Sequence, residues 1–315
     1  MTHGPDVGVL GVDVGGTKVA LRAEAAGRPT YERTFSWPTG GGPADAGHAA
    51  GDPAGDLAAL DAAVAALRTT WGPVGAVGVA MPATTDPDGR VLTWPGRPSW
   101  TGLDLTGALR RIFPDVPIGY ADDGDLAALA EARDAGHDDL VYLGVGTGIG
   151  GGIVLGGRPV PARASAEVGH MVVDLDGATC DCGRIGCLQS VASGPATLRR
   201  AAREHGGAVS FDQLRAGWRN RLPWAVTAVD ESCAALASAV VSLGELLAVP
   251  VAVVGGGFAD GLPGFVPRVA DLARQAGRPG RPAPTVRAAV LGGLSSLHGA
   301  LWLARDLATD RTGSR

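Results

Sequence analysis

Three of the chain's four cysteines lie close together in the segment CDCGRIGC. They are Cys180, Cys182 and Cys187, and His170 precedes them in the segment EVGHMVV. Three thiolates and a neutral imidazole form a donor set that structural Zn²⁺ sites use. Four protein ligands leave no coordination position for a substrate, so a zinc ion here would hold a loop together. The alternative is that these cysteines are buried as small apolar residues.

Three glycine-rich segments each follow an apolar stretch typical of a buried strand. They are DVGGTK at 13–18, GVGTGIGGG at 144–152 and VGGGFAD at 254–260. Glycine lets backbone N–H groups approach a phosphate, and a hydroxyl or a lysine nearby adds donors. One such segment alone is explained by an ordinary glycine hairpin, but three favour a phosphate-binding site. Neither a P-loop nor a dinucleotide-binding GxGxxG is present in its required setting.

An acidic turn, YADDGDLAAL, begins a predicted alanine-rich helix and contains Asp122, Asp123 and Asp125. Aspartate at this place caps a helix and complements its dipole. Capping explains one aspartate well and three less well. In phosphoryl transfer, an aspartate commonly accepts the proton of the attacking hydroxyl. The turn is therefore a candidate both for a cap and for a catalytic base.

The surrounding segments alternate between strand and helix patterns. Residues 7–25 and 139–160 each predict two strands joined by a glycine turn. Helical spacing of apolar residues predicts helices over 56–72, 194–205 and 230–248, and the last of these places Cys233 in the core. Residues 37–55 and 95–102 read as loops. The recurrence of an apolar strand that ends in a glycine loop, at 8–18, 141–152 and 251–257, suggests two related α/β lobes around a cleft.

Composition excludes several classes of protein. The chain has 315 residues, of which 45% are apolar, so it suits one large domain or two of ordinary size. A net charge of −5 argues against a surface that binds nucleic acid. We recognise no signal peptide and no uninterrupted membrane-length apolar run, so we expect a cytoplasmic protein without a membrane partner. Cysteines stay reduced there, which favours metal binding over disulfides.

In this order, Asp13-Val-Gly-Gly-Thr-Lys18, Glu167-Val-Gly-His170 and Cys180-x-Cys182-Gly-x-x-Gly-Cys187 resemble motifs of the ROK family (repressors, open reading frames and sugar kinases). The resemblance covers most of the chain and implies an α/β protein with the actin-like (hexokinase-like) ATPase fold, two lobes around a central cleft. The first glycine turn comes too early for the DNA-binding module of ROK repressors. The resemblance therefore implies a free-standing kinase, and it suggests a homodimer through the larger lobe.

On this basis we expect a small lobe at residues 1–118, with the C-terminal helix, about 299–315, packed back on it. The large lobe with the zinc-stapled loop is expected at 119–298. The cofactors implied are ATP, Mg²⁺ and a structural Zn²⁺. The reaction implied is in-line attack of a primary hydroxyl on the γ-phosphate of MgATP.

The resemblance also assigns roles residue by residue. Asp123 matches the catalytic base that takes the proton of the sugar's primary hydroxyl. The substrate contacts implied are Asp122, Glu167, His170, Gln189, Pro95 and Gly96. The nucleotide contacts implied are Asp13, Gly15, Gly16, Thr17, Lys18, Gly146, Thr147, Gly148, Gly255, Gly256 and Gly257. The zinc ligands implied are His170, Cys180, Cys182 and Cys187.

Three places depart from the family's sugar kinases. Asp122 stands where asparagine is usual, Gln189 where glutamate is usual, and Trp94-Pro95-Gly96 where Ala-Pro-Asn is frequent. Asparagine can donate a hydrogen bond, whereas an ionised aspartate only accepts. Because a site that binds particular hydroxyls discriminates steeply, we expect a hexose-like substrate other than plain glucose. A C7-cyclitol of an aminocyclitol antibiotic pathway is the first candidate.

Other functions stay open at this point. An ordinary glucokinase would make glucose 6-phosphate. A non-catalytic ROK-type sugar sensor is disfavoured by the presence of Asp123 and the phosphate-loop residues. An acetate- or glycerol-kinase-like enzyme is disfavoured by the cysteine motif.

Overall fold

The structure, a computed structural model, describes residues 8–38, 51–94, 96–160 and 165–313. The chain divides into two compact units, each with its own sheet. Unit 1 comprises Met1–Ala130, Ala162–Ser165 and Ser295–Arg315, and unit 2 comprises Glu131–Pro161 and Ala166–Leu294. The division falls inside helix α3 (Asp123–Ala135), later than the boundary expected after residue 118. The lobe boundaries expected from the sequence stay a prediction.

Unit 1 is built on a five-stranded sheet of order β3-β2-β1-β4-β7. β1 pairs antiparallel with β2 and parallel with β4, and β4 pairs parallel with β7. The strands are β1 (Gly8–Val14), β2 (Lys18–Glu24), β3 (Tyr31–Ser36), β4 (Val74–Ala80) and β7 (Ile118–Ala121). A short ribbon of β5 (Thr84–Thr85) and β6 (Val91–Thr93) and the helical turn η1 (Pro98–Trp100) complete the strand connections.

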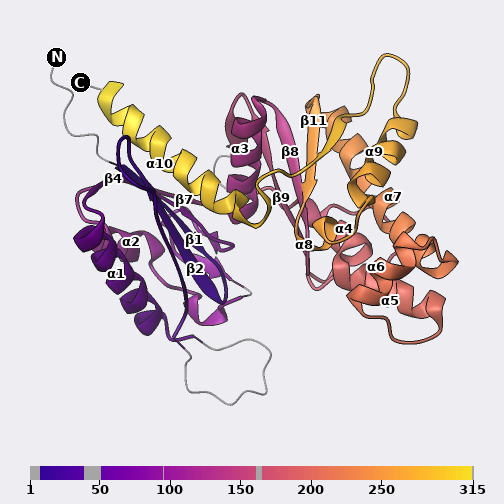
Figure 1. The fold of residues 1–315 in the computed structure, drawn as a ribbon, viewed down its shortest axis with the longest axis horizontal. Coiled ribbons are helices and arrows are strands. Elements are labelled where there is room, and N and C mark those ends of the chain that lie inside the picture. Colours follow the sequence, from indigo (N-terminus) through magenta and orange to yellow (C-terminus); the bar gives the residue numbers. More distant parts are fainter. Residues whose placement is uncertain (1–7, 39–50, 95, 161–164, 314–315) are drawn as a thin grey trace. The chain divides into compact units, whose positions relative to one another are not determined.

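Helices cover the sheet of unit 1. The helices α1 (Pro53–Thr70) and α2 (Leu105–Ile112) share an apolar core with the sheet and with the buried side chains of Trp94 and Trp100. α10 (Ser295–Gly313) packs on β1 and β4 (Figure 1). A Cβ atom at Gly78 would lie 2.0 Å from the carbonyl oxygen of Ala300. Glycine in the middle of β4 therefore lets α10 approach the sheet backbone closely.

Unit 2 repeats the same plan. Its sheet has the order β10-β9-β8-β11-β12, in which β8 pairs antiparallel with β9 and parallel with β11. The strands are β8 (Leu140–Val145), β9 (Ile149–Leu155), β10 (Arg158–Val160), β11 (Val251–Gly255) and β12 (Thr285–Ala288). The correspondence of order and direction between the two sheets confirms the inference of two related α/β halves.

The helices of unit 2 surround one large core. They are α4 (Leu188–Ala192), α5 (Gly194–His205), α6 (Phe211–Arg219), α7 (Pro223–Leu247), α8 (Gly257–Asp260) and α9 (Phe265–Ala276), with the turns η2 (Val168–His170) and η3 (Gly292–Leu294). Among the described residues, only α7 is long and apolar enough to cross a membrane, judged by length and composition. It packs against α5 and α9, and Cys233 on it is fully buried as expected.

Two predicted helix starts were wrong. α7 begins at Pro223 and not at residue 230, with a proline in its first turn, where a helix tolerates proline. α1 begins at Pro53, inside the expected loop, because the side chain of Asp52 caps it. Within that loop, residues 39–50 lie outside the described residues. The expected loop at 95–102 contains η1.

Candidate active site and metal centre

The carboxyl edge of the sheet in unit 1 gathers the candidate residues of that unit. Strand register places Asp13 beside Ala80, and Ala80 beside Ala121. Ala121 leads directly into Asp122 and the first turn of α3. Asp13 and the acidic turn therefore lie at the same edge, two strand spacings or about 10 Å apart along the sheet. In open α/β sheets this edge is where ligands bind.

The first glycine turn joins β1 to β2 at this edge. The amide of Gly15 donates to the carbonyl of Lys18 at 2.9 Å, which closes the hairpin. The side chains of Thr17 and Lys18 are exposed, and Gly16 is partly exposed. A Cβ atom at Gly16 would lie 3.3 Å from the Cα of Gly96, so the turn packs directly against the segment that follows Trp94.

Asp13 is a mostly buried carboxyl with one identified donor. The hydroxyl of Ser296, at the start of α10, donates to Oδ2 of Asp13 at 2.9 Å. Burial raises the pKa of Asp13, while the hydroxyl of Ser296 and the charge of Lys18 lower it in part. Sequence motifs did not identify Ser296. The signal available was a serine pair after Gly-Gly-Leu at the start of the last helix.

The acidic turn shows the geometry of a helix cap. Oδ1 of Asp122 accepts from the amide of Gly124 at 2.9 Å, and α3 begins at Asp123. The capping interpretation is thus confirmed for Asp122. Asp123 occupies the first helical position and is partly exposed, whereas Asp125 is 3% exposed. An asparagine at position 122 would cap the helix as well as aspartate does, so the cap does not require the charge.

The Trp94-Pro95-Gly96 segment follows strand β6. Pro95 lies outside the described residues. Trp94 is 1% exposed, and its ring packs edge to face on the ring of Trp100, with the ring centres 4.8 Å apart. The bulk of Trp94 therefore fills the core of unit 1. Gly96 contacts Gly16, because a Cβ atom at position 96 would lie 3.2 Å from the Cα of Gly16.

The second and third glycine turns lie next to each other in unit 2. Gly144 on β8 pairs in register with Gly255 on β11, so the turns that follow both strands share one sheet edge. Gly256 has φ 95°, and a Cβ atom there would lie 2.6 Å from the backbone nitrogen of Val145. Only glycine fits this position. The amide of Gly194 donates to the carbonyl of Gly146 at 2.9 Å and fixes the second turn.

The segment Glu167–His170 lies against β9. A Cβ atom at Gly169 would lie 1.9 Å from the carbonyl oxygen of Ile149, so a glycine is needed where η2 crosses the strand. Glu167 is exposed and His170 is partly exposed. Nδ1 of His170 lies 3.7 Å from Sγ of Cys180. With Nδ1 on the cysteine side, the other ring nitrogen, Nε2, remains for a second role.

The four predicted metal ligands form one cluster. Their ligand atoms all lie within 4.8 Å of one another, and Sγ of Cys182 lies 3.7 Å from Sγ of Cys187. A tetrahedral zinc site with Zn–S bonds of about 2.3 Å has sulfur–sulfur edges of about 3.8 Å. Cys180 and Cys187 are buried and Cys182 is exposed. The donor types and their spacing fit a structural Zn²⁺ ion.

The electrostatics of the cluster agree with this fit. Burial and the neighbouring sulfurs of Cys182 and Cys180 raise the pKa of Cys187 to about 12. The backbone amide of Arg184 lowers the pKa of Cys182. Three thiolates this close repel one another strongly unless a cation lies among them. A divalent ion would let all three deprotonate together.

Gln189 connects the cysteine cluster to the second glycine turn. Its Nε2 donates to Sγ of Cys180 at 3.6 Å, and its Oε1 accepts from the amide of Ile149 at 3.4 Å. The two neighbours fix the orientation of the amide, because a thiolate needs a donor and an N–H needs an acceptor. A glutamate could not donate to the sulfur. The sequence predicted Gln189 as a substrate contact, which stays a prediction, and did not predict this link.

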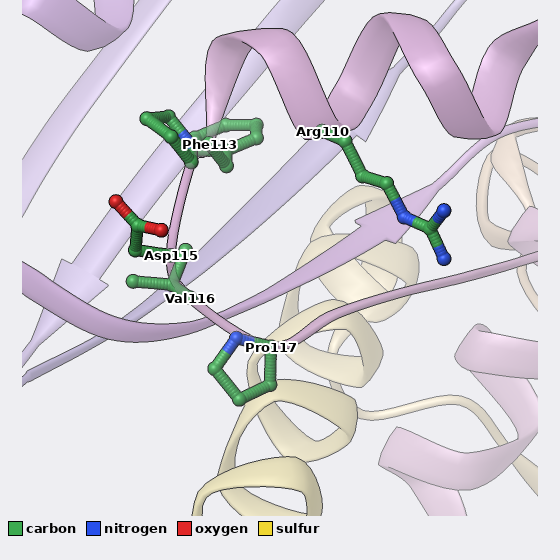
Figure 2. A pocket seen from close by; sticks show the side chains of 6 residues that line it. Arg110, Phe113, Asp115, Val116 and Pro117 are labelled. Carbon is green, nitrogen blue, oxygen red and sulfur yellow. The ribbon is translucent and has the colours of Figure 1, made fainter.

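The structure thus brings the predicted residues together in two groups, one in each unit. Asp13, the first turn and the acidic turn share the sheet edge of unit 1. The other two turns, the 167–170 segment and the cysteine cluster belong to unit 2. A separate open hollow of about 580 Å³ lies in unit 1 (Figure 2). It is lined by Arg110, Phe113, Pro114, Asp115, Val116 and Pro117, none of which belongs to a predicted site.

The paired sheets with glycine turns at their carboxyl edges define a class, the actin-like, hexokinase-like ATPases. The model of the ROK family matches residues 9–307, and the chain belongs to the ROK family. Both the family and the fold class expected from the sequence motifs are therefore confirmed.

Three relatives illustrate the match. A kanosamine kinase from Amycolatopsis mediterranei (strain S699) is 51% identical over 298 residues, which cover 94% of this chain and 95% of the relative. A ROK hexokinase from Thermus thermophilus has a TM-score of 0.83 at 28% identity, covering 96% of this chain and 100% of its own. A ROK glucokinase from Streptomyces griseus, solved with glucose and AMPPNP, has a TM-score of 0.73 at 28% identity, covering 95% and 99%. The expectation of an ATP-dependent carbohydrate kinase is confirmed.

Proposed function

We propose that this kinase transfers the γ-phosphate of ATP to the primary hydroxyl of an amino hexose of the kanosamine type. The observation that carries the proposal is the 51% identity to a kanosamine kinase over 94% of the chain. Kanosamine is glucose with an amino group in place of the 3-hydroxyl, so it keeps the primary hydroxyl at C6. It also meets the expectation of a hexose-like ring other than plain glucose.

The charge of Asp122 supports an amino-sugar acceptor. The cap of α3 needs only an acceptor oxygen, which either aspartate or asparagine provides. The ionised carboxylate adds a full negative charge next to Asp123. A protonated amino group is the ligand group that such a charge favours, because charge-assisted hydrogen bonds are about twice as strong as neutral ones. We assign to Asp122 the recognition of this ammonium group.

Asp123 is the proposed general base. It accepts the proton of the primary hydroxyl while the oxygen attacks the γ-phosphorus and the bond to the bridging β,γ-oxygen breaks. Its place at the first position of α3, directly after β7, gives the carboxylate a rigid support. To Glu167 and to Nε2 of His170 we assign contacts with ring hydroxyls.

The glycine turns are the proposed nucleotide contacts. The backbone amides of the first and second turns bind phosphate oxygens, and the Gly255–Gly257 turn lies against the adenosine. Asp13 offers the carboxylate oxygen that Mg²⁺ prefers as a ligand. When bound, Mg²⁺ supplies positive charge that neutralises the phosphates of ATP.

A structural Zn²⁺ ion is the proposed occupant of the cluster of His170, Cys180, Cys182 and Cys187. Its role is to hold the loop that supports His170, and binding energy becomes folding energy of that loop. The cysteines and the amide of Gln189 keep the loop in contact with the second turn. The proposed zinc thus takes no part in phosphoryl transfer and acts only by holding this loop in place.

A panel of acceptors tests the proposal. Steady-state kcat/KM with MgATP is measured for kanosamine, glucose, N-acetylmannosamine and a C7-cyclitol that carries an exocyclic CH₂OH. We expect kanosamine to exceed glucose by at least about tenfold, the value of one charge-assisted hydrogen bond. If the cyclitol is the best acceptor, the substrate expected first from the sequence is the correct one and the kanosamine proposal is wrong. Glucose as the best acceptor would make the protein an ordinary glucokinase, and sugar binding without turnover would make it a sensor.

We further propose that the enzyme acts in the cytoplasm as a homodimer. The proposal rests on the resemblance to the ROK family. Light scattering coupled to size-exclusion chromatography measures the mass of the particle, and the mass of one chain, 31.6 kDa, would contradict it.

A further inference from the structure

Three consecutive carbonyl groups of the first glycine turn accept hydrogen bonds from Trp37 and Arg97. Nε1 of Trp37 donates to the carbonyl of Gly15 at 2.7 Å, and Nη1 of Arg97 donates to that of Gly16 at 3.0 Å. The backbone amide of Trp37 donates to the carbonyl of Thr17 at 3.2 Å. In a planar trans peptide, each carbonyl points opposite to the following N–H. The amides of Gly16 and Thr17 are therefore aimed away from these donors.

Arg97 is itself fixed by a buried ion pair. Its Nε and Nη2 donate to the two carboxylate oxygens of Asp56 at 2.8 Å and 2.6 Å. Nε1 of Trp100 donates to the same carboxylate at 2.9 Å. Arg97 is 2% exposed and Asp56 is 1% exposed, and the guanidinium lies 5.0 Å from the ring centre of Trp37. All three guanidinium nitrogens thus have defined partners, and only Nη1 reaches the turn.

A buried ion pair such as that of Arg97 and Asp56 adds little to the stability of the fold by itself. Removing two charges from water costs about as much as their attraction returns, and apolar side chains of similar volume often do as well. What a bidentate arginine–aspartate pair provides is fixed geometry. Here the fixed guanidinium donates its remaining hydrogen bond, from Nη1, to the carbonyl of Gly16. The glycine turn has no side chains to pack except those of Thr17 and Lys18, which are exposed, so its position depends on bonds to its backbone.

We propose that Trp37, Asp56, Arg97 and Trp100, which we call the turn clamp, position the amides of Gly16 and Thr17 for the phosphates of the nucleotide. Arg97 and Trp37 are positioning residues that act through the backbone of the turn. The inference rests on the proposed function, because it assumes that this turn binds ATP. It adds residues that the ROK motifs in this sequence do not contain, from α1, η1 and the segment after β3.

Two conservative substitutions test the turn clamp. Trp37→Phe keeps an aromatic ring below the guanidinium and removes the donor to Gly15. Arg97→Lys keeps a positive charge beside Asp56 but cannot bond to the carboxylate and to Gly16 together. Arg268→Lys is the matched control, because Arg268 also forms a bidentate pair, with Asp230 at 2.9 Å, but in unit 2 between helices α9 and α7.

The readout is the Kd for MgADP by calorimetry, without acceptor, together with KM values for ATP and for the sugar. Each test variant is expected to weaken MgADP binding about fivefold, the value of one hydrogen bond. KM for ATP should rise in parallel, and KM for the sugar should stay within about twofold, as should every value for Arg268→Lys. A melting temperature close to wild type confirms folding, and Trp37→Phe decides if Arg97→Lys does not fold.

The two levels of the proposal fail in different ways. Wild-type protein that binds no MgADP would contradict the proposed function and, with it, the turn clamp. Wild-type protein that binds MgADP, with equal affinity in folded Trp37→Phe and Arg97→Lys, would overturn the turn clamp alone. Equal rises in KM for ATP and for sugar would also overturn it, since a general loss of structure would then explain the effect.

Discussion

The substitution Asp122→Asn tests the proposed recognition of an amino group. Asparagine has the same shape as aspartate and keeps the acceptor for the amide of Gly124, which lies 2.9 Å from Oδ1. The cap is retained, and only the charge at the helix N-terminus is lost, a cost of about 0.3–1 kcal/mol. The variant should therefore fold, with a melting temperature only a few degrees below wild type.

The effect on selectivity should be larger than the effect on stability. A hydrogen bond to a charged partner contributes about 1.5–3 kcal/mol and a neutral one about 0.5–1.5 kcal/mol. Losing the charge of Asp122 should therefore cost the amino sugar about 1–2 kcal/mol, or about 5–30-fold in kcat/KM. Glucose brings no cation and should lose little. The ratio of kcat/KM for kanosamine to that for glucose should fall by the same factor.

The assay is coupled measurement of ADP release for both sugars, over a pH range that includes the titration of the sugar's amine. In wild type the preference for kanosamine should decline as the amine loses its proton, and in Asp122→Asn the decline should be absent. Asp104→Asn is the matched control, because Asp104 caps α2 through the amide of Gly107 at 2.8 Å. A selectivity ratio unchanged within about twofold in Asp122→Asn would refute the assignment of the ammonium group to this carboxylate.

Three further predictions concern the base, an aspartate pKa and the metal. Asp123→Asn should lower kcat by about 10²–10⁴-fold with a wild-type melting curve, and wild-type turnover would refute its role as base. Ser296→Ala removes the hydroxyl that lowers the raised pKa of Asp13. Mg²⁺ needs the ionised carboxylate, so the acidic limb of the kcat/KM profile should move to higher pH, whereas an unmoved limb contradicts this. Cys180→Ser should lose the proposed zinc, measured by elemental analysis, and should melt several degrees lower than wild type. The control Cys233→Ser should keep the metal. Metal retained in Cys180→Ser would contradict the proposed ligand set.

Local patterns were sufficient to predict much of this molecule. Strand periodicity and glycine turns predicted the hairpins of both units, and cysteine spacing predicted the cluster of His170 with three cysteines. The cap at Asp122 was visible as one of two interpretations. These features depend on residues that lie near one another in the chain, whose effect is local.

The residues that were missed act across long separations in sequence. Arg97 donates hydrogen bonds to Asp56 and Gly16, and Ser296 donates one to Asp13. In each case the partners lie far apart in the sequence. No periodicity reports such partners, although a single arginine among tryptophans in TWPGRPSW is a recognisable hint of a buried ion pair. The burial of Trp94 could not be predicted for the same reason, because it depends on Trp100 and the helices around it.

The most direct test of the proposed activity is to identify the product by NMR. Kanosamine and MgATP are incubated with wild-type enzyme, and the phosphorus signal is correlated with the protons of the carbon that bears it. We predict a phosphomonoester on the C6 oxygen, formed in step with ADP, and no product with Asp123→Asn. A phosphoramidate on the amino nitrogen, an ester at a ring hydroxyl, or ADP formed with no sugar phosphate would contradict the account.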